Sequence, residues 1–181
     1  MEYDSSPTNM EIKKTVLSKE QIQARVTELG QEITSDYGDK KLVMLGVLNG
    51  AFIFTADLCR AVDLELEIDF IRVASYGNAT HSSGTIRLSK PSEIDLKGKH
   101  VLLVEDIIDT GHTLAWLTSH FAEMGAESVK ICALINKHER REVEVQVDYS
   151  GFSIDQGYLV GYGLDCAEIH RNLPQVYSLA D

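Results

Sequence analysis

The chain has 181 residues, of which 44% are hydrophobic and 25% are charged. This length and composition predict one soluble globular domain, residues 1–181, with a substantial core. The net charge of −11 argues against nonspecific binding to nucleic acid or to an anionic membrane, because bulk electrostatics would repel both.

Cysteine usage and hydropathy indicate a cytoplasmic protein. Cys59, Cys132 and Cys166 are widely spaced and lack the paired spacing of zinc ligands, so we expect reduced and mostly buried thiols. Residues 1–14 are polar and contain no apolar signal segment. The longest apolar stretch, residues 42–54, has a polar interruption and is too short to span a bilayer.

The sequence patterns up to residue 135 predict three helices and four strands. Residues 1–15 are expected to be a loosely ordered lead-in. Ser18 and Gln21 have the spacing of a capping box, and the apolar residues after them recur at helical spacing, which predicts a helix over 18–37. Short apolar runs predict strands at 42–48, 66–75, 100–104 and 129–135. Two more helices are expected, at 51–62 and 112–124.

Loops of distinct character separate these elements. Residues 76–85 are small, polar and flanked by glycine, which is typical of a long, mobile and functional loop, and residues 86–88 are expected to return as a hairpin. Residues 137–141 form a charged loop, and the tail from 158 has the pattern of short strands and turns. Strands that alternate with helices predict a parallel α/β sheet, in which ligands bind at the carboxyl ends of the strands.

Residues 101–114, with the sequence VLLVEDIIDTGHTL, contain the strongest functional signal. An apolar strand leads to the adjacent acids Glu105 and Asp106, and Asp109 then precedes a small, hydroxyl-bearing turn at a predicted helix start. Carboxylates accept hydrogen bonds from sugar hydroxyls, and backbone N–H groups at a helix N-terminus bind phosphate. Taken alone, the acid pair is typical of a solvated loop or a helix cap. Beside this turn, it indicates a site for a phosphorylated ribose.

The same segment closely resembles the phosphoribosyl-pyrophosphate motif of type I purine phosphoribosyltransferases, and other segments extend the resemblance over most of the chain. Residues 48–50 resemble the pyrophosphate loop of that family, and Ser75-Tyr76 opens the equivalent of its mobile catalytic loop. Lys137 resembles its purine-recognition lysine. Residues 158–165, YLVGYGLD, resemble the C-terminal hood of the bacterial hypoxanthine-guanine branch, which other branches lack.

This resemblance implies the type I phosphoribosyltransferase fold: a central parallel sheet flanked by helices, a mobile catalytic loop and a small hood. The core would span about residues 38–160, and the hood would combine residues 158–181 with N-terminal residues. The implied reaction is purine salvage with Mg²⁺ as cofactor, in which phosphoribosyl pyrophosphate and a 6-oxopurine give IMP or GMP and pyrophosphate. The implied assembly is a homodimer or homotetramer, with no nucleic-acid or membrane partner.

The resemblance also assigns residues to the phosphoribosyl donor. Glu105 and Asp106 would fix the ribose hydroxyls and, together with Asp165, hold Mg²⁺. Arg171 would bind pyrophosphate through a planar, bidentate contact. Asp109 would act as general base or acid toward the purine, with a helix N-cap as its alternative role. The 5′-phosphate would be held by Thr110, Gly111, His112 and Thr113. The pyrophosphate loop would contribute Leu48, Asn49 and Gly50.

Four residues are assigned to the purine in the same way. Lys137 would donate a hydrogen bond to the 6-oxo group, which selects against a 6-amino purine such as adenine. Tyr158 would stack on the ring, and the backbone around Leu159 and Asp165 would read the opposite edge. Taken alone, Lys137 is typical of a solvated loop and Tyr158 of core packing, so both roles depend on the resemblance.

Two positions depart from the pattern of mammalian members. Asn49 and His112 each stand where a lysine often occurs, so phosphate contacts there are expected from backbone N–H groups. The family often has a non-proline cis peptide in the pyrophosphate loop, which would be Leu48–Asn49 here. A second hypothesis keeps the fold without catalysis: a regulator that senses phosphoribosyl pyrophosphate and binds RNA. Such a protein should carry a basic surface, and the net charge of −11 argues against it.

Overall fold

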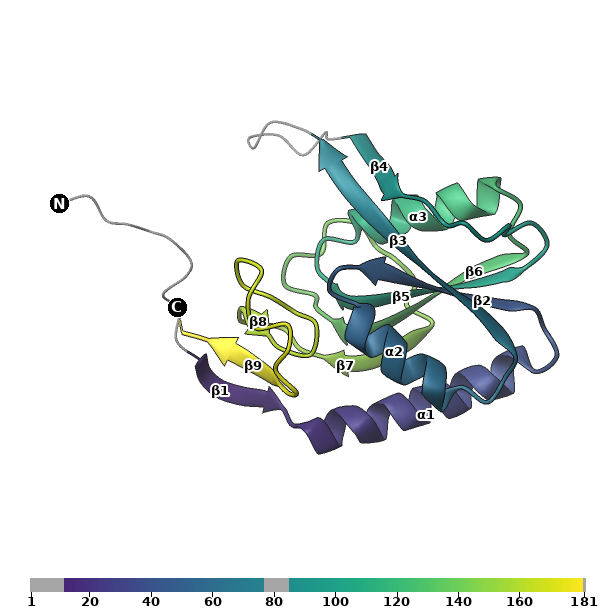
Figure 1. Ribbon diagram of the computed structural model, residues 1–181. Coiled ribbons are helices and arrows are strands. Elements are labelled where there is room, and N and C mark those ends of the chain that lie inside the picture. Colours follow the sequence, from purple (N-terminus) through teal and green to yellow (C-terminus); the bar gives the residue numbers. More distant parts are fainter. Residues whose placement is uncertain (1–11, 77–84, 181) are drawn as a thin grey trace.

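The structure is a computed structural model that describes residues 12–76 and 85–180. Within these ranges the chain forms three helices and two sheets (Figure 1). The helices are α1 (Lys19–Tyr37), α2 (Phe52–Ala61) and α3 (His112–Glu123). The strands are β1 (Ile12–Leu17), β2 (Leu42–Leu48), β3 (Leu66–Tyr76), β4 (Thr85–Lys90), β5 (His100–Ile108), β6 (Ser128–Asn136), β7 (Tyr149–Ser153), β8 (Leu159–Val160) and β9 (Val176–Leu179).

The larger sheet places the ends of β2 and β5 next to each other. Its strand order is β4-β3-β2-β5-β6-β7, and every neighbouring pair is parallel except β3 and β4. The chain moves from β2 outward to β3 and β4, and then returns to the opposite side of β2 to form β5, β6 and β7. In open parallel sheets, ligands bind beyond the carboxyl ends of the strands at such a change of direction. The topology therefore indicates a site beyond β2 and β5.

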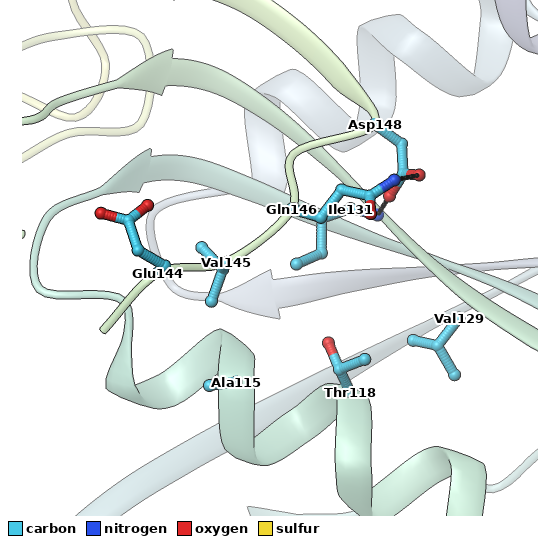
Figure 2. Close-up of a pocket in the computed structure, with 8 residues that line it drawn as sticks. All are labelled: Ala115, Thr118, Val129, Ile131, Glu144, Val145, Gln146 and Asp148. Carbon is cyan, nitrogen blue, oxygen red and sulfur yellow. Dashed lines mark hydrogen bonds between the residues drawn. The ribbon is translucent and has the colours of Figure 1, made fainter.

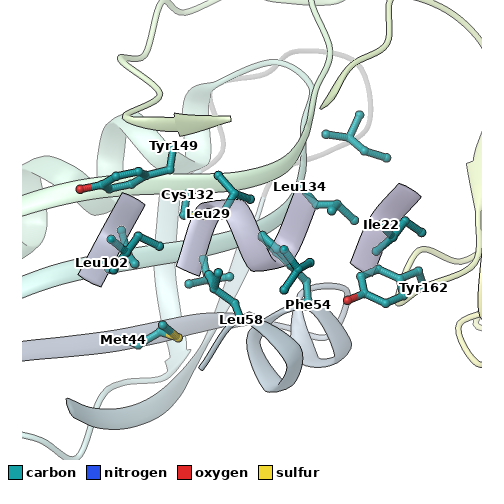
Figure 3. Close-up of a cluster of buried hydrophobic side chains, with 14 of the residues drawn as sticks. Ile22, Leu29, Met44, Phe54, Leu58, Leu102, Cys132, Leu134, Tyr149 and Tyr162 are labelled. Carbon is teal, nitrogen blue, oxygen red and sulfur yellow. The ribbon is translucent and has the colours of Figure 1, made fainter. Parts of the chain in front are cut away.

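Helices cover both faces of this sheet (Figure 1). On one face, Leu29 of α1 and Phe54 of α2 pack in a buried cluster with Met44, Leu102 and Leu134 of the strands (Figure 3). On the other face, α3 packs in a second buried cluster with strand residues that alternate with those of the first cluster, such as Leu45 and Leu103. Successive side chains of a strand point to opposite faces, so the continuous apolar runs of β2 and β5 supply both clusters.

The smaller sheet joins the N-terminal and C-terminal ends of the described chain. β9 pairs antiparallel with both β1 and β8, in the order β1-β9-β8. This sheet is the predicted hood, built from C-terminal and N-terminal residues. The expectation of a loosely ordered lead-in is wrong for residues 12–15, because β1 obtains its backbone partners from β9 at the other end of the sequence.

The predicted helices and strands are present. Ser18 caps α1 through a capping box, in which its Oγ accepts from Gln21 N at 3.3 Å and Gln21 Oε1 accepts from Ser18 N at 2.8 Å. β3 and β4 form the expected hairpin, although residues 77–84 of the predicted loop lie outside the described residues. Two strand predictions need correction. β5 continues to Ile108 because its last residues still pair with β6, and β7 was not expected.

The cysteines agree with the prediction of reduced and mostly buried thiols. Cys132 and Cys166 are buried, Cys59 is partly buried, and none of the three forms a disulfide with another described residue. Among residues 12–76 and 85–180, no helix combines the length and the apolar content required to cross a bilayer.

Candidate active site

The candidate site lies where three segments meet beyond the ends of β2 and β5. Gly50, just after β2, packs so closely on Asp106 that a side chain at position 50 would collide with the Asp106 carboxylate. Gly163, in the hood, packs equally closely on the carbonyl oxygen of Gly50. Only backbone without a β-carbon fits at these two contacts. The structure therefore brings together the predicted pyrophosphate loop, the acid pair and the hood.

The predicted pyrophosphate loop connects β2 to α2. The peptide bond between Leu48 and Asn49 is cis, as the resemblance implied. Ala51 N donates to Val47 O at 3.2 Å and closes the turn. The side chain of Asn49 accepts a hydrogen bond at Oδ1 from Nη2 of Arg72, at 3.0 Å. Arg72 lies on β3 and was not among the predicted site residues.

Glu105 and Asp106 lie inside β5, so they neither solvate a loop nor cap a helix. Asp106 is buried and Glu105 is half-buried. Burial raises the pKa of Glu105 well above its ordinary range, and the charge of neighbouring Asp106 raises it further. Burial also raises the pKa of Asp106, against the opposing effects of its hydrogen bonds with Glu105 and backbone N–H groups and of the Arg171 charge. The ionised pair therefore needs a cation or hydroxyl donors, as a ribose bound with a metal would provide.

Replacing Glu105 with glutamine should stabilise the ligand-free protein at neutral pH. A raised pKa means that the folded chain binds the proton more tightly than the unfolded chain. The resulting stability is present below the ordinary value of 4.5 and is lost as pH rises through the folded pKa. Glu105→Gln removes this titration, so its melting temperature should exceed that of the parent by roughly 2–4 °C near pH 8 and by less near pH 5. Calorimetry at both pH values measures the difference. The exposed variant Glu123→Gln is the control, and an excess that does not change with pH would contradict the assignment.

The predicted phosphate turn joins β5 to α3. Gly111 occupies the N-cap of α3 with φ +90°, and a side chain there would collide with the carbonyl oxygen of Val143. Thr110 O accepts from Glu142 N and Val143 N, both at 3.0 Å, which holds the charged loop against the turn. A hollow of about 150 Å³ opens at this turn. Its lining consists of Glu105, Ile107, Ile108, Asp109, Thr110, Gly111, Thr113 and Leu114.

Asp109 lines this hollow, and one of its carboxylate oxygens has no partner among the described residues. Its Oδ1 is buried and has no hydrogen-bond partner within the described part of the chain, whereas its Oδ2 lies 3.2 Å from Arg140 Nη1. Because Gly111 is the N-cap of α3, the alternative role of Asp109 as a helix cap is excluded. The ring of His112, at the start of α3, already has a partner outside the turn. Its Nε2 lies 2.9 Å from Glu142 Oε2.

The purine-side residues differ from what their types alone suggest. Lys137 is buried rather than solvated: its Nζ donates to Gly157 O at 3.1 Å and lies 3.2 Å from Glu139 Oε2. Tyr158 is 51% exposed and does not pack in the core, whereas Leu159 is buried in β8. The ammonium group of Lys137 therefore lies at Gly157, the residue that precedes Tyr158 and the hood.

Arg141 connects the two sides of the site, and sequence reasoning missed it. Its Nε donates to Asp109 O at 3.1 Å, and its Nη2 donates to Lys137 O at 2.9 Å and to Asn136 Oδ1 at 2.7 Å. The sequence shows two adjacent arginines in a charged loop, and nothing in that pattern indicates which of them turns inward. Arg141 fixes the distance between Asp109 and Lys137.

The hood contributes an arginine–carboxylate pair. Arg171 Nη2 lies 2.9 Å from Asp165 Oδ1, and Arg171 Nη1 donates to Gly163 O at 2.9 Å. The two hood residues predicted to handle pyrophosphate and Mg²⁺ thus contact each other. Ser75 and Tyr76 end β3 and pair with Ile86 and Thr85 of β4, so the backbone enters the predicted catalytic loop from that hairpin.

The donor set fits Mg²⁺ as a cation shared with a ligand. Glu105, Asp106 and Asp165 offer carboxylate oxygens, the ligand type that Mg²⁺ prefers. Among the described residues, no group of three or more acids, histidines or cysteines is gathered closely enough to hold a metal by itself. Mg²⁺ in proteins commonly binds one or two carboxylates together with water and substrate phosphates, and the acids present suit that mode.

A second hollow, of about 300 Å³, lies between α3, β6 and the segment before β7 (Figure 2). Asp148 accepts hydrogen bonds from Ile131 N at 2.9 Å and from Gln146 Nε2 at 3.3 Å, so its carboxylate holds this segment against β6. The lining contains none of the predicted site residues. It consists of Ala115, Thr118, Val129, Ile131, Glu144, Val145, Gln146 and Asp148.

Comparison with known proteins agrees with this fold. Residues 14–167 match the family model for the phosphoribosyl transferase domain, and the chain belongs to this family. It is 44% identical over 166 residues to the hypoxanthine-guanine phosphoribosyltransferase of Bacillus subtilis, which is 92% of each chain. The protein of the same name from Aquifex aeolicus is 44% identical over 93% of this chain and 95% of that one.

Solved structures give the same result. A hypoxanthine-guanine phosphoribosyltransferase from Bacillus anthracis has a TM-score of 0.88 at 42% identity, covering 95% of this chain and 100% of that chain. A hypoxanthine phosphoribosyltransferase from Staphylococcus aureus has a TM-score of 0.90 at 37% identity, covering 99% and 97%. The resemblance recognised in the sequence and the type I fold are both confirmed.

Proposed function

We propose that this chain transfers the 5-phosphoribosyl group of phosphoribosyl pyrophosphate to hypoxanthine, and also to guanine, giving IMP or GMP and pyrophosphate. The observation that carries the proposal concerns Asp109, which lines the hollow beside the phosphate turn and whose buried Oδ1 has no hydrogen-bond partner among the described residues. A buried carboxylate oxygen without a donor costs free energy, so it indicates a ligand that supplies a proton or an N–H group. Relatives named hypoxanthine-guanine phosphoribosyltransferase support the same assignment.

The donor would lie across the ends of β5 and the hood. Backbone N–H groups at the start of α3 would hold the 5′-phosphate, and Glu105 and Asp106 would accept hydrogen bonds from the ribose hydroxyls. Arg171 would bind the pyrophosphate group. Mg²⁺, held with help from Asp165 and the acid pair, would neutralise charge on the leaving group.

The reaction would exchange one bond at C1 of the ribose for another. The C1–O bond to pyrophosphate breaks and its electron pair leaves with pyrophosphate, while a purine ring nitrogen donates its pair to C1. The proton lost from the purine imidazole ring passes to the Asp109 carboxylate, which acts as general base. The fixed site would contribute orientation and exclude water.

Purine selection would depend on Lys137 and the hood. The Lys137 ammonium group donates only, so it would match a 6-oxo group and oppose a 6-amino group. When the base binds, Lys137 Nζ would donate to the 6-oxo group in place of Gly157 O, its partner in this structure. Tyr158, exposed next to it, would stack on the ring, and the backbone at Leu159 would read the opposite edge.

The direct test supplies the purified protein with Mg²⁺, phosphoribosyl pyrophosphate and one base at a time. We expect absorbance changes with hypoxanthine and guanine and none with adenine. Turnover of adenine alone would overturn the purine assignment, and no turnover with any base would overturn the function. A predicted homodimer or homotetramer is tested separately by light scattering.

Lys137→Met should weaken the use of hypoxanthine selectively. Loss of a hydrogen bond from a charged donor is expected to lower kcat/KM for hypoxanthine by about 10- to 100-fold. The KM for phosphoribosyl pyrophosphate should change little, because Lys137 lies on the purine side. Lys41→Met, which removes an exposed lysine, is the matched control. An equal loss for both substrates would instead indicate a structural role for Lys137.

A further inference from the structure

Arg72 places a positive charge at the pyrophosphate loop. In the sheet register it is paired with Leu48, the last residue of β2, so it lies beside the point where the loop begins. Its side chain is exposed, and its Nη2 donates to Asn49 Oδ1 at 3.0 Å. Within residues 12–76 and 85–180, its other guanidinium donors have no partner.

The partner of Arg72 leaves its charge available. Asn49 is neutral, so the hydrogen bond orients the guanidinium without cancelling its charge. Two other arginines at the site lie against carboxylates, Arg171 against Asp165 and Arg140 against Asp109. The guanidinium of Arg141 donates to three oxygens inside the site. Arg72 has no carboxylate partner in the described part of the chain.

An anionic ligand needs such a charge at this edge. The site contains the acid pair of β5, Asp109 and Asp165, and the whole chain has a net charge of −11. A pyrophosphate group brought to the loop adjoining Asp106 meets a repulsive field unless cations offset it. A guanidinium matches two phosphate oxygens at once, through parallel N–H donors.

We propose that Arg72 binds the pyrophosphate end of the phosphoribosyl donor, with Asn49 as the residue that orients it. This inference rests on the proposed function and adds a donor-binding residue on β3. The ligand class is an organic diphosphate, or free pyrophosphate as the product. The charge at the loop thus comes from the neighbouring strand rather than from position 49 itself.

Arg72→Gln should act on the donor and not on the base. We expect KM for phosphoribosyl pyrophosphate to rise by about tenfold, which corresponds to about 1.4 kcal/mol, with kcat and the KM for hypoxanthine within about twofold of the parent. The difference should shrink at high ionic strength, because an exposed charge is screened. Arg60→Gln, an exposed arginine at the far end of α2 paired with Asp57, is the control for net charge.

Moving the cation provides the decisive comparison. Asn49→Lys in the Arg72→Gln background should restore most of the lost affinity for phosphoribosyl pyrophosphate. Asn49→Ala should raise the KM by less than Arg72→Gln, because the charge remains but is no longer oriented. A structural role for Arg72 would lower the melting temperature and would not be rescued by a lysine at position 49.

The outcomes separate this inference from the proposed function. If the parent turns over hypoxanthine and Arg72→Gln matches Arg60→Gln, the inference fails and the function stands. If calorimetry shows that the parent binds phosphoribosyl pyrophosphate but the parent has no turnover, the proposed function fails. The inference about Arg72 then stands if Arg72→Gln binds this probe more weakly than the parent, and fails if the two affinities are equal. If the parent neither binds the probe nor turns over, both fail.

Discussion

Replacing Asp109 with alanine should lower kcat for IMP formation by about 10²–10⁴-fold, the range typical of a lost general base. Asp109 lines the hollow at the phosphate turn, and its Oδ1 has no hydrogen-bond partner among the described residues, so we assign the uptake of the purine proton to this carboxylate. The donor contacts lie on other residues, so affinity for phosphoribosyl pyrophosphate and for IMP should be retained. Steady-state kinetics with hypoxanthine, combined with calorimetric binding of IMP, measures both quantities.

Stability gives this prediction a second readout. A buried carboxylate oxygen without a partner destabilises the fold, so Asp109→Ala should melt at the same temperature as the parent or higher. Asp39→Ala, which removes an exposed acid after α1, is the control for loss of one negative charge. If Asp109→Ala keeps more than about a tenth of the parent kcat, the general-base role is wrong. A fall in both melting temperature and IMP affinity would indicate that Asp109 holds the turn instead.

Local patterns were sufficient to predict the elements that position the donor. The capping box at Ser18, the apolar runs of β2 and β5 and the small, hydroxyl-bearing turn before α3 each depend on neighbours a few residues away. A resemblance over most of the chain then supplied the branch of the family. The acid pair was located correctly, although β5 proved longer, because strand length depends on pairing with β6.

Features that depend on distant pairing could not be predicted from these patterns. β1 is a strand only because β9 is available as its partner, and its own residues show no apolar alternation. Lys137 is buried and donates to the carbonyl oxygen of Gly157, which no local signal connects to it. Arg141 and Arg72 belong to the site through hydrogen bonds to Asp109 and Asn49, and their types alone would be equally common on a solvated surface.

Gly163→Ala should disable the hood without unfolding the core. Gly163 has φ +103°, its N donates to Arg171 O at 2.9 Å, and its carbonyl accepts from Arg171 Nη1 at 2.9 Å. A β-carbon would collide with the carbonyl oxygen of Gly50, which is backbone and has little room to move. The hood would have to shift away from the pyrophosphate loop and take Arg171 with it. We expect kcat/KM for phosphoribosyl pyrophosphate to fall by about 10²-fold, because a misplacement of about 1 Å costs that much in an oriented site.

Gly157→Ala is the control that separates the collision of a β-carbon with Gly50 from the strain of a left-handed backbone. Gly157 lies next to the hood and also has a left-handed backbone, with φ +101°, but a β-carbon there would have no atom within 4 Å. Both variants should lose roughly 1–3 kcal/mol of stability through their left-handed backbone, measured by denaturant unfolding. Only Gly163→Ala should also lose activity, since the carbonyl of residue 157 that Lys137 contacts is retained by alanine. Equal kinetic losses in the two variants would mean that backbone strain, rather than the packing of the hood on Gly50, sets the geometry of the donor site.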